Sequence, residues 1–179
     1  MGLFTITTSW INQRHRWIFS YCQKHRIKIA WNPGQRQLSW RKSRLVKSIA
    51  QTHLLIVNRD EALQLATVLH KTKVQNNPKA LFKILAQGQA LTAITDGPRG
   101  AYLYDGSKII FQKALDRKPV NTTGAGDCFG SSLVAGIIRY NGDLSRAMRL
   151  AIINSNTVIM KIGAQVGLLT ARDLKKYHL

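Results

Sequence analysis

The chain is poor in cysteine and in acidic residues, and it lacks long apolar runs. Its 179 residues include two cysteines, Cys22 and Cys128, which form neither a metal-site spacing nor a redox pair. Two isolated thiols fit a reducing compartment. No run of about 18 apolar residues is present, and the first residues have neither the basic nor the apolar region of a secretory leader. We therefore expect a soluble, cytoplasmic protein with no membrane partner.

Acidic residues are scarce beside basic ones, with 8 Asp and Glu against 27 Lys and Arg, and the formal net charge is +19. Residues 1–59 contain eleven Lys or Arg and no acid. Such a surface attracts nucleic acid or phosphorylated molecules without specificity. The basic residues form no compact block and no zinc-finger spacing or RNP-type aromatic string occurs, so nucleic acid is expected only as a non-specific partner. The alternative is that the cations are scattered over solvated faces.

The hydrophobic pattern predicts strands that alternate with helices. Apolar runs indicate strands over 26–31, 53–58 and 90–97, and helical periodicity indicates helices over 10–25, 43–51, 59–72 and 79–87. A hairpin over 101–112 and two helices, 128–140 and 144–162, complete the pattern. This alternation is typical of an α/β fold with a parallel sheet covered on both faces. No linker or repeat divides the chain, so 1–179 is treated as one domain.

The segment from Asn121 to Asp127, NTTGAGD, carries the strongest chemical pattern. Gly124, Ala125 and Gly126 allow the backbone to approach a ligand, and a helix that starts there directs unpaired N–H groups and a positive dipole end at it. These features predict an anion site. The carboxylate of Asp127 could take a proton from a hydroxyl while the donors hold a phosphoryl group. The alternative is an ordinary turn in which Asp127 caps the helix.

This segment, followed by Phe129, resembles the second signature of the ribokinase-like (PfkB) family of carbohydrate and nucleoside kinases, DTTGAGD-x-F. Three further segments resemble family motifs in the same order: Asn58 with Glu61 is similar to NxxE, Thr95 with Gly97 and Gly100 to T-x-G-x-x-G, and 163–165 to a Gly-Ala-Gln ending. From the residues alone, Asn58 and Glu61 also fit a helix N-terminus with a capping box, and Thr95 and Gly97 a strand-to-turn corner.

The resemblance implies a three-layer ribokinase-like sandwich with a mainly parallel sheet and ATP-dependent phosphorylation of a sugar. Asp127 would be the general base, and the amides of Gly124, Ala125 and Gly126 would form the anion hole. Asn58, Thr95, Gly97 and Gly100 would bind the nucleotide, and Mg²⁺ would be held through water near Glu61. A monovalent cation near 163–165 is disfavoured, because Asn121 replaces the aspartate of the signature and removes a negative charge.

The resemblance covers only the C-terminal, nucleotide-binding half of the family, and the N-terminal strands and sugar-gripping residues have no counterpart. One alternative is therefore a truncated, non-catalytic nucleotide-binding remnant or interaction module that needs a partner chain. Another is a basic nucleic-acid binder on a kinase fold. The substrate, a sugar rather than a nucleoside, is inferred from the Gly-Ala-Gln ending. We expect Trp10, Trp17 and Trp31 in the core, with leftover surface for a missing half as the alternative.

Overall fold

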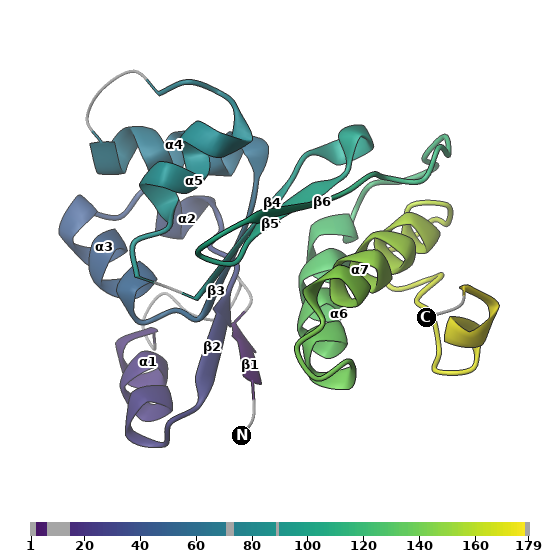
Figure 1. Cartoon of the computed structure of the whole chain (residues 1–179), viewed down its shortest axis with the longest axis horizontal. Coiled ribbons are helices and arrows are strands. Elements are labelled where there is room, and N and C mark those ends of the chain that lie inside the picture. The colour runs from purple at the N-terminus through teal and green to yellow at the C-terminus, as the bar shows by residue number, and fades with distance from the viewer. Residues whose placement is uncertain (1–2, 7–14, 71–73, 89, 178–179) are drawn as a thin grey trace. The chain divides into compact units, whose positions relative to one another are not determined.

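A computed structural model describes residues 3–6, 15–70, 74–88 and 90–177. The chain folds into two compact units (Figure 1). The first unit comprises Met1–Thr95 and Tyr102–Ile109, and the second comprises Asp96–Ala101 and Ile110–Leu179. In the described part of the chain, no helix has the length and apolar content needed to cross a membrane.

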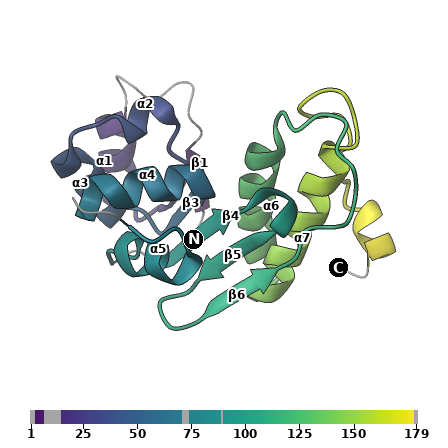
Figure 2. The ribbon, with the colours of Figure 1, turned by 90° about the horizontal axis from the view of Figure 1, so that it is seen from above.

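The described strands form one six-stranded sheet whose spatial order follows the sequence. Its strands are β1 (Leu3–Ile6), β2 (Lys28–Trp31), β3 (Leu54–Asn58), β4 (Leu91–Thr95), β5 (Ala101–Tyr104) and β6 (Ile109–Gln112). The first four strands pair in parallel. The arrow of β5 runs opposite to those of β4 and β6 in Figure 2, as expected for the hairpin predicted over 101–112. The sheet is therefore mixed and mainly parallel, which confirms the predicted α/β class.

The helices described in the first unit pack with the sheet around one hydrophobic core. They are α1 (His15–Lys24), α2 (Gln35–Leu38), α3 (Lys42–Ala50), α4 (Arg59–His70) and α5 (Pro78–Leu85). The strands contribute alternate side chains to this core, and the helices contribute apolar residues such as Phe19, Leu45 and Phe82. The intervening side chains of β3, Leu54 and Ile56, are buried as well. Burial of both faces is the pattern of a central parallel strand.

The helix boundaries follow from local capping. The Asn77 side chain accepts a hydrogen bond from the Ala80 amide at 2.9 Å, and Pro78 takes the first helical position of α5, where a missing N–H costs nothing.

The part of the second unit that the structure describes contains α6 (Ala125–Arg139), α7 (Leu144–Val158) and two short 3₁₀ helices, Gly97–Arg99 and Asp173–Tyr177. A Cβ at Gly136 of α6 would lie 2.7 Å from the Ala147 Cα of α7, so these two helices cross at a glycine.

The structure differs from the expectations in some of its elements and in the position of one tryptophan. The pattern does not predict β1 or the short α2, and α7 ends at Val158 rather than at residue 162. Trp31 lies in the core as expected, but Trp17 is 64% exposed, so its assignment to the core is wrong. The exposure arises because α1 turns Phe19 and Cys22 inward and the Trp17 face outward. Residues 10–14, with Trp10, and residues 71–72 of the predicted helices lie outside the described residues.

Candidate functional site

The loop before α6 is held by the end of α7 within the second unit. The amides of Val120 and Asn121 both donate to the Ile159 carbonyl, at 2.8 and 3.1 Å. The Asn121 side chain accepts from the Thr123 amide at 2.8 Å and closes a small turn. The loop of residues 121–127 therefore starts from a fixed point.

Gly124 occupies the N-cap position of α6 in a left-handed conformation, with φ 82° and ψ −3°. A Cβ at this position would lie 2.7 Å from the Ala164 carbonyl oxygen and 2.8 Å from the Ala164 Cβ. Both the backbone conformation and the close approach require glycine here. The contact also brings the loop against the segment 163–165, so two motifs found separately in the sequence form one structure.

The loop amides differ in whether the protein already uses them. The Ala125 amide donates to the Thr122 carbonyl at 3.2 Å, and the Cys128 amide donates to the Gly124 carbonyl at 2.8 Å. Within the described ranges, the amides of Gly124, Gly126 and Asp127 have no acceptor. Open donors at a helix N-terminus, together with the helix dipole, make a site for an anion.

Asp127 lies in the first turn of α6, three residues after the N-cap, and its side chain is exposed. Gly124, not Asp127, is the N-cap residue, so the capping alternative for Asp127 is not the arrangement found. In the described part of the chain the Asp127 carboxylate makes no hydrogen bond or ion pair. It is thus an acceptor beside open backbone donors.

Asn58 and Glu61 form a capping box where β3 passes into α4 in the first unit. The Asn58 amide donates to Glu61 Oε2 at 2.9 Å, and the Glu61 amide donates to Asn58 Oδ1 at 2.8 Å. Burial raises the pKa of the Glu61 carboxyl, with Asp60 adding to the rise and the bond from Asn58 opposing it. Since the folded pKa is raised, ionisation of Glu61 opposes folding as the pH rises through that value.

The ends of two parallel strands place Asn58 and Thr95 side by side. Thr95 at the end of β4 is the register partner of Asn58 at the end of β3. The carboxyl ends of parallel strands are where ligands bind in open α/β sheets. The Asn32 side chain, just after β2, donates to the Ile56 carbonyl at 2.7 Å and ties a third strand end to this edge.

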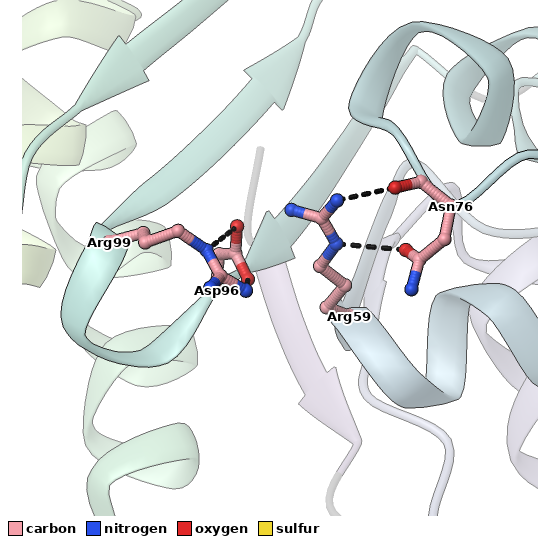
Figure 3. Close-up of polar contacts among 4 residues, drawn as sticks. All are labelled: Arg59, Asn76, Asp96 and Arg99. Carbon is pink, nitrogen blue, oxygen red and sulfur yellow. Dashed lines mark hydrogen bonds and ion pairs between the residues drawn. The ribbon is translucent and has the colours of Figure 1, made fainter.

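The turn after β4 contains an ion pair between the buried Asp96 and the exposed Arg99, which the sequence pattern did not predict. Asp96 is 4% exposed and accepts two hydrogen bonds from Arg99, from Nε at 2.9 Å and from Nη2 at 2.7 Å (Figure 3). Gly97 and Gly100 have positive φ values of 54° and 116°. The sequence signal for this pair is an acidic residue at the end of a strand with an arginine three residues later.

A second arginine, Arg59 at the start of α4, forms a clamp of two hydrogen bonds to one residue. Arg59 lies between Asn58 and Glu61, and its guanidinium donates from Nε to Asn76 Oδ1 at 2.9 Å and from Nη2 to the Asn76 carbonyl at 2.5 Å (Figure 3). The contact joins residues that are 17 positions apart. Position in the NxxE motif alone did not indicate this partner. The clamp fixes the segment before α5 to the helix that carries Glu61.

The described residues contain no group of three or more His, Cys, Asp or Glu able to hold a metal ion. Mg²⁺ commonly binds through one or two carboxylates, with water and substrate phosphates as its other ligands. Glu61 uses Oε2 for the Asn58 amide, and no contact of Oε1 is found among the described residues. The Oε1 oxygen of Glu61 therefore fits a magnesium ion whose other ligands are mainly water and substrate phosphates.

Comparison with known proteins gives one consistent family. A model of the pfkB family carbohydrate kinase matches residues 18–171. A ribokinase of Lactococcus lactis is 30% identical over 158 residues, which cover 88% of this chain and 47% of the ribokinase. The chain thus spans about half the length of the curated relatives it matches.

Solved structures show the same fold. A Burkholderia thailandensis nucleoside kinase in complex with inosine superposes with a TM-score of 0.84 at 20% identity, covering 99% of this chain and 56% of that one. A Vibrio cholerae fructokinase with bound fructose, ADP and calcium gives a TM-score of 0.81 at 15% identity, covering 98% and 60%. At these identities the likeness is one of fold, and it is the ribokinase-like fold expected.

Proposed function

The chain belongs to the pfkB family of carbohydrate kinases, and on that premise we propose that it carries out ATP-dependent phosphoryl transfer to a hydroxyl of a sugar. The observation that carries the proposal is the loop at the start of α6, where an unpartnered Asp127 carboxylate stands beside open amides. Relatives named ribokinase support a sugar over a nucleoside. A cytidine kinase of Thermococcus kodakarensis, 29% identical over 142 residues, keeps nucleosides among the substrates to test.

In the proposed reaction Asp127 accepts the proton of the substrate hydroxyl as its oxygen attacks the γ-phosphorus of ATP. The bond from that phosphorus to the bridging oxygen breaks, and ADP leaves with the electron pair. The open amides of Gly124, Gly126 and Asp127, with the N-terminus of α6, stabilise the charge of the transferring group. Ala125, whose amide is bonded to Thr122, shapes the loop in this proposal and does not donate.

In the first unit, the strand ends that carry Asn58 and Thr95 would contact the nucleotide phosphates. In the second unit, the turn of Gly97 and Gly100 would contribute its backbone to nucleotide binding. Mg²⁺, when bound near Glu61, supplies positive charge that offsets the charge of the phosphates. A monovalent cation beside the loop would meet Asn121, whose neutral side chain offers no formal charge.

Nucleotide binding predicts a thermal shift for the chain as it exists. ATP with Mg²⁺ at about 100 times its Kd should add about 2.7 kcal/mol to the unfolding free energy, because only the folded state binds. For a chain of this size, that corresponds to a rise in Tm of about 5–10 °C by differential scanning fluorimetry. Mg²⁺ alone and inorganic phosphate are the controls. If neither ATP nor ADP shifts the Tm at millimolar concentration, the proposal is wrong.

Glu61→Gln separates the capping role of Glu61 from its metal role. A glutamine oxygen can still accept from the Asn58 amide, so the unfolding free energy should change by less than about 1 kcal/mol. The loss of the negative charge should raise the Mg²⁺ concentration that gives half of the ATP-dependent shift by at least about 10-fold. Asp60→Asn, which removes the neighbouring exposed charge, is the matched control. Equal Mg²⁺ responses of the two variants would argue against a metal role.

A second candidate function follows from the fraction of its relatives' length that the chain spans. With about half their length matched, the chain could be a nucleotide-binding module whose phosphotransfer needs a second chain. The two functions predict different results in one assay. An ATP-dependent Tm shift without phosphorylation of any sugar or nucleoside supports the module, and product formation by the chain alone supports the kinase.

A further inference from the structure

The outward face of α1 carries a column of aromatic rings. Trp17 and Tyr21 lie four residues apart on one side of α1, and His25, another four residues on, lies in the turn just after the helix, where its amide donates to the Tyr21 carbonyl at 3.0 Å. The ring centroids of Trp17 and Tyr21 lie 5.4 Å apart with planes inclined by 24°, and those of Tyr21 and His25 lie 4.2 Å apart at 35°. Trp17 is 64% and Tyr21 45% exposed, and His25 is exposed as well. We call these three residues the α1 ring column.

The sequence that adjoins the α1 ring column is basic. Lys24, Arg26 and Lys28 are all exposed, and no acidic residue occurs before Asp60. A contiguous exposed group of rings, unlike a single exposed side chain, is typical of an interaction surface. A partner that matches both features must offer flat rings for stacking and regularly spaced negative charge.

We propose that the α1 ring column and these three cations form a docking surface for single-stranded nucleic acid. Its bases are free to stack on the exposed rings while its phosphates pair with the lysines and the arginine. Duplex DNA or RNA keeps its bases stacked inside and offers only charge. The binding is independent of base sequence, because rings and point charges read no base edges.

An anionic membrane is the less favoured partner for this face. A helix that lies in a membrane interface inserts a continuous apolar face. The apolar side of α1 is already used, because Phe19 and Cys22 are each 2% exposed and belong to the core of the first unit. What remains outside is an aromatic and cationic face on a ten-residue helix.

The test is fluorescence anisotropy of a labelled oligo-dT titrated with the whole chain, at low salt and at about 0.15 M salt. Trp17→Ala with Tyr21→Ala should weaken binding by at least about 10-fold, the usual effect of losing a stacked ring. Trp17→Phe should retain most of the affinity, since a ring remains. Phe111→Ala, which removes an exposed ring from β6, is the matched control and should bind as the unaltered chain does.

Two further arms decide the nature of the contact. Lys24→Gln with Arg26→Gln should make the dependence of log K on log salt shallower by about 0.7 per lost contact, whereas the ring variants should leave that slope unchanged. A duplex of the same length should bind less tightly at about 0.15 M salt. Equal binding by the ring variants, tighter binding of the duplex, or binding to phosphatidylserine vesicles but not to oligo-dT would each overturn the proposal.

Discussion

Asp127→Asn is expected to lower the rate of phosphoryl transfer by about 10²–10⁴-fold, the usual contribution of a general base. Asparagine has the same shape but does not take up the proton of the hydroxyl. Asp127 is exposed and makes no hydrogen bond through its carboxylate among the described residues, so the fold should lose no more than about 1 kcal/mol, the usual interaction of a first-turn acid with the helix dipole, and the ATP-dependent Tm shift should remain. The measurement is the initial rate of ADP formation with a panel of sugars and nucleosides.

The matched control for this variant is Asp116→Asn, which removes one exposed negative charge at another position. It should leave the rate within a factor of about two, since surface substitutions away from a site have small effects. Asp127→Asn activity above a tenth of the unaltered rate would exclude Asp127 as the base. If the unaltered chain forms no product, the same pair of variants is compared with an added chain that supplies the rest of the family's length.

Gly100→Ala should destabilise the protein by more than about 3 kcal/mol, through steric overlap added to backbone strain. Gly100 has φ 116° and ψ −143°, a region that residues with a Cβ avoid. A Cβ there would lie 2.2 Å from the Gln112 carbonyl oxygen and 2.9 Å from the Lys113 Cα. Because these contacts are backbone atoms, no side chain can move aside to relieve them.

Gly106→Ala is the control that separates backbone strain from the steric overlap of the added methyl group. Gly106 also has a positive φ, 94°, but a Cβ there meets nothing within 4 Å. Its substitution should cost only about 1–3 kcal/mol. Urea unfolding monitored by circular dichroism measures both values. Similar losses of unfolding free energy in the two variants would contradict the prediction, because they would show that the backbone around Gln112 moves away from a Cβ at residue 100 at little cost.

Much of the fold is predictable from the sequence because its elements are locally encoded. The run LLIV before Asn58 indicates a buried strand, and Asn77-Pro78 marks the start of a helix. The end of α7 is not encoded in this way. Its pattern continues to residue 162, but the Ile159 carbonyl accepts the amides of Val120 and Asn121, and a distant segment therefore ends the helix at Val158.

The candidate site shows the same division between local and distant causes. The glycines and the acid of the loop are recognisable as an anion-binding pattern, and Asn58 with Glu61 as a capping box. The sequence does not show which loop amides lack an acceptor, because the hydrogen bond from the Ala125 amide to the Thr122 carbonyl depends on the turn that the loop adopts. The exposure of Trp17 was missed for a related reason: helical spacing identifies a face but does not say which face is buried.

The contact between Gly124 and Ala164 links two positions that are far apart in the sequence. A Cβ added at Gly124 would lie 2.8 Å from the Ala164 Cβ, so a change at 164 acts on the same contact as a change within the loop. Selection for enzymatic or binding activity would then act on both sites as a unit. In a family of such sequences, positions 124 and 164 should vary together or not at all.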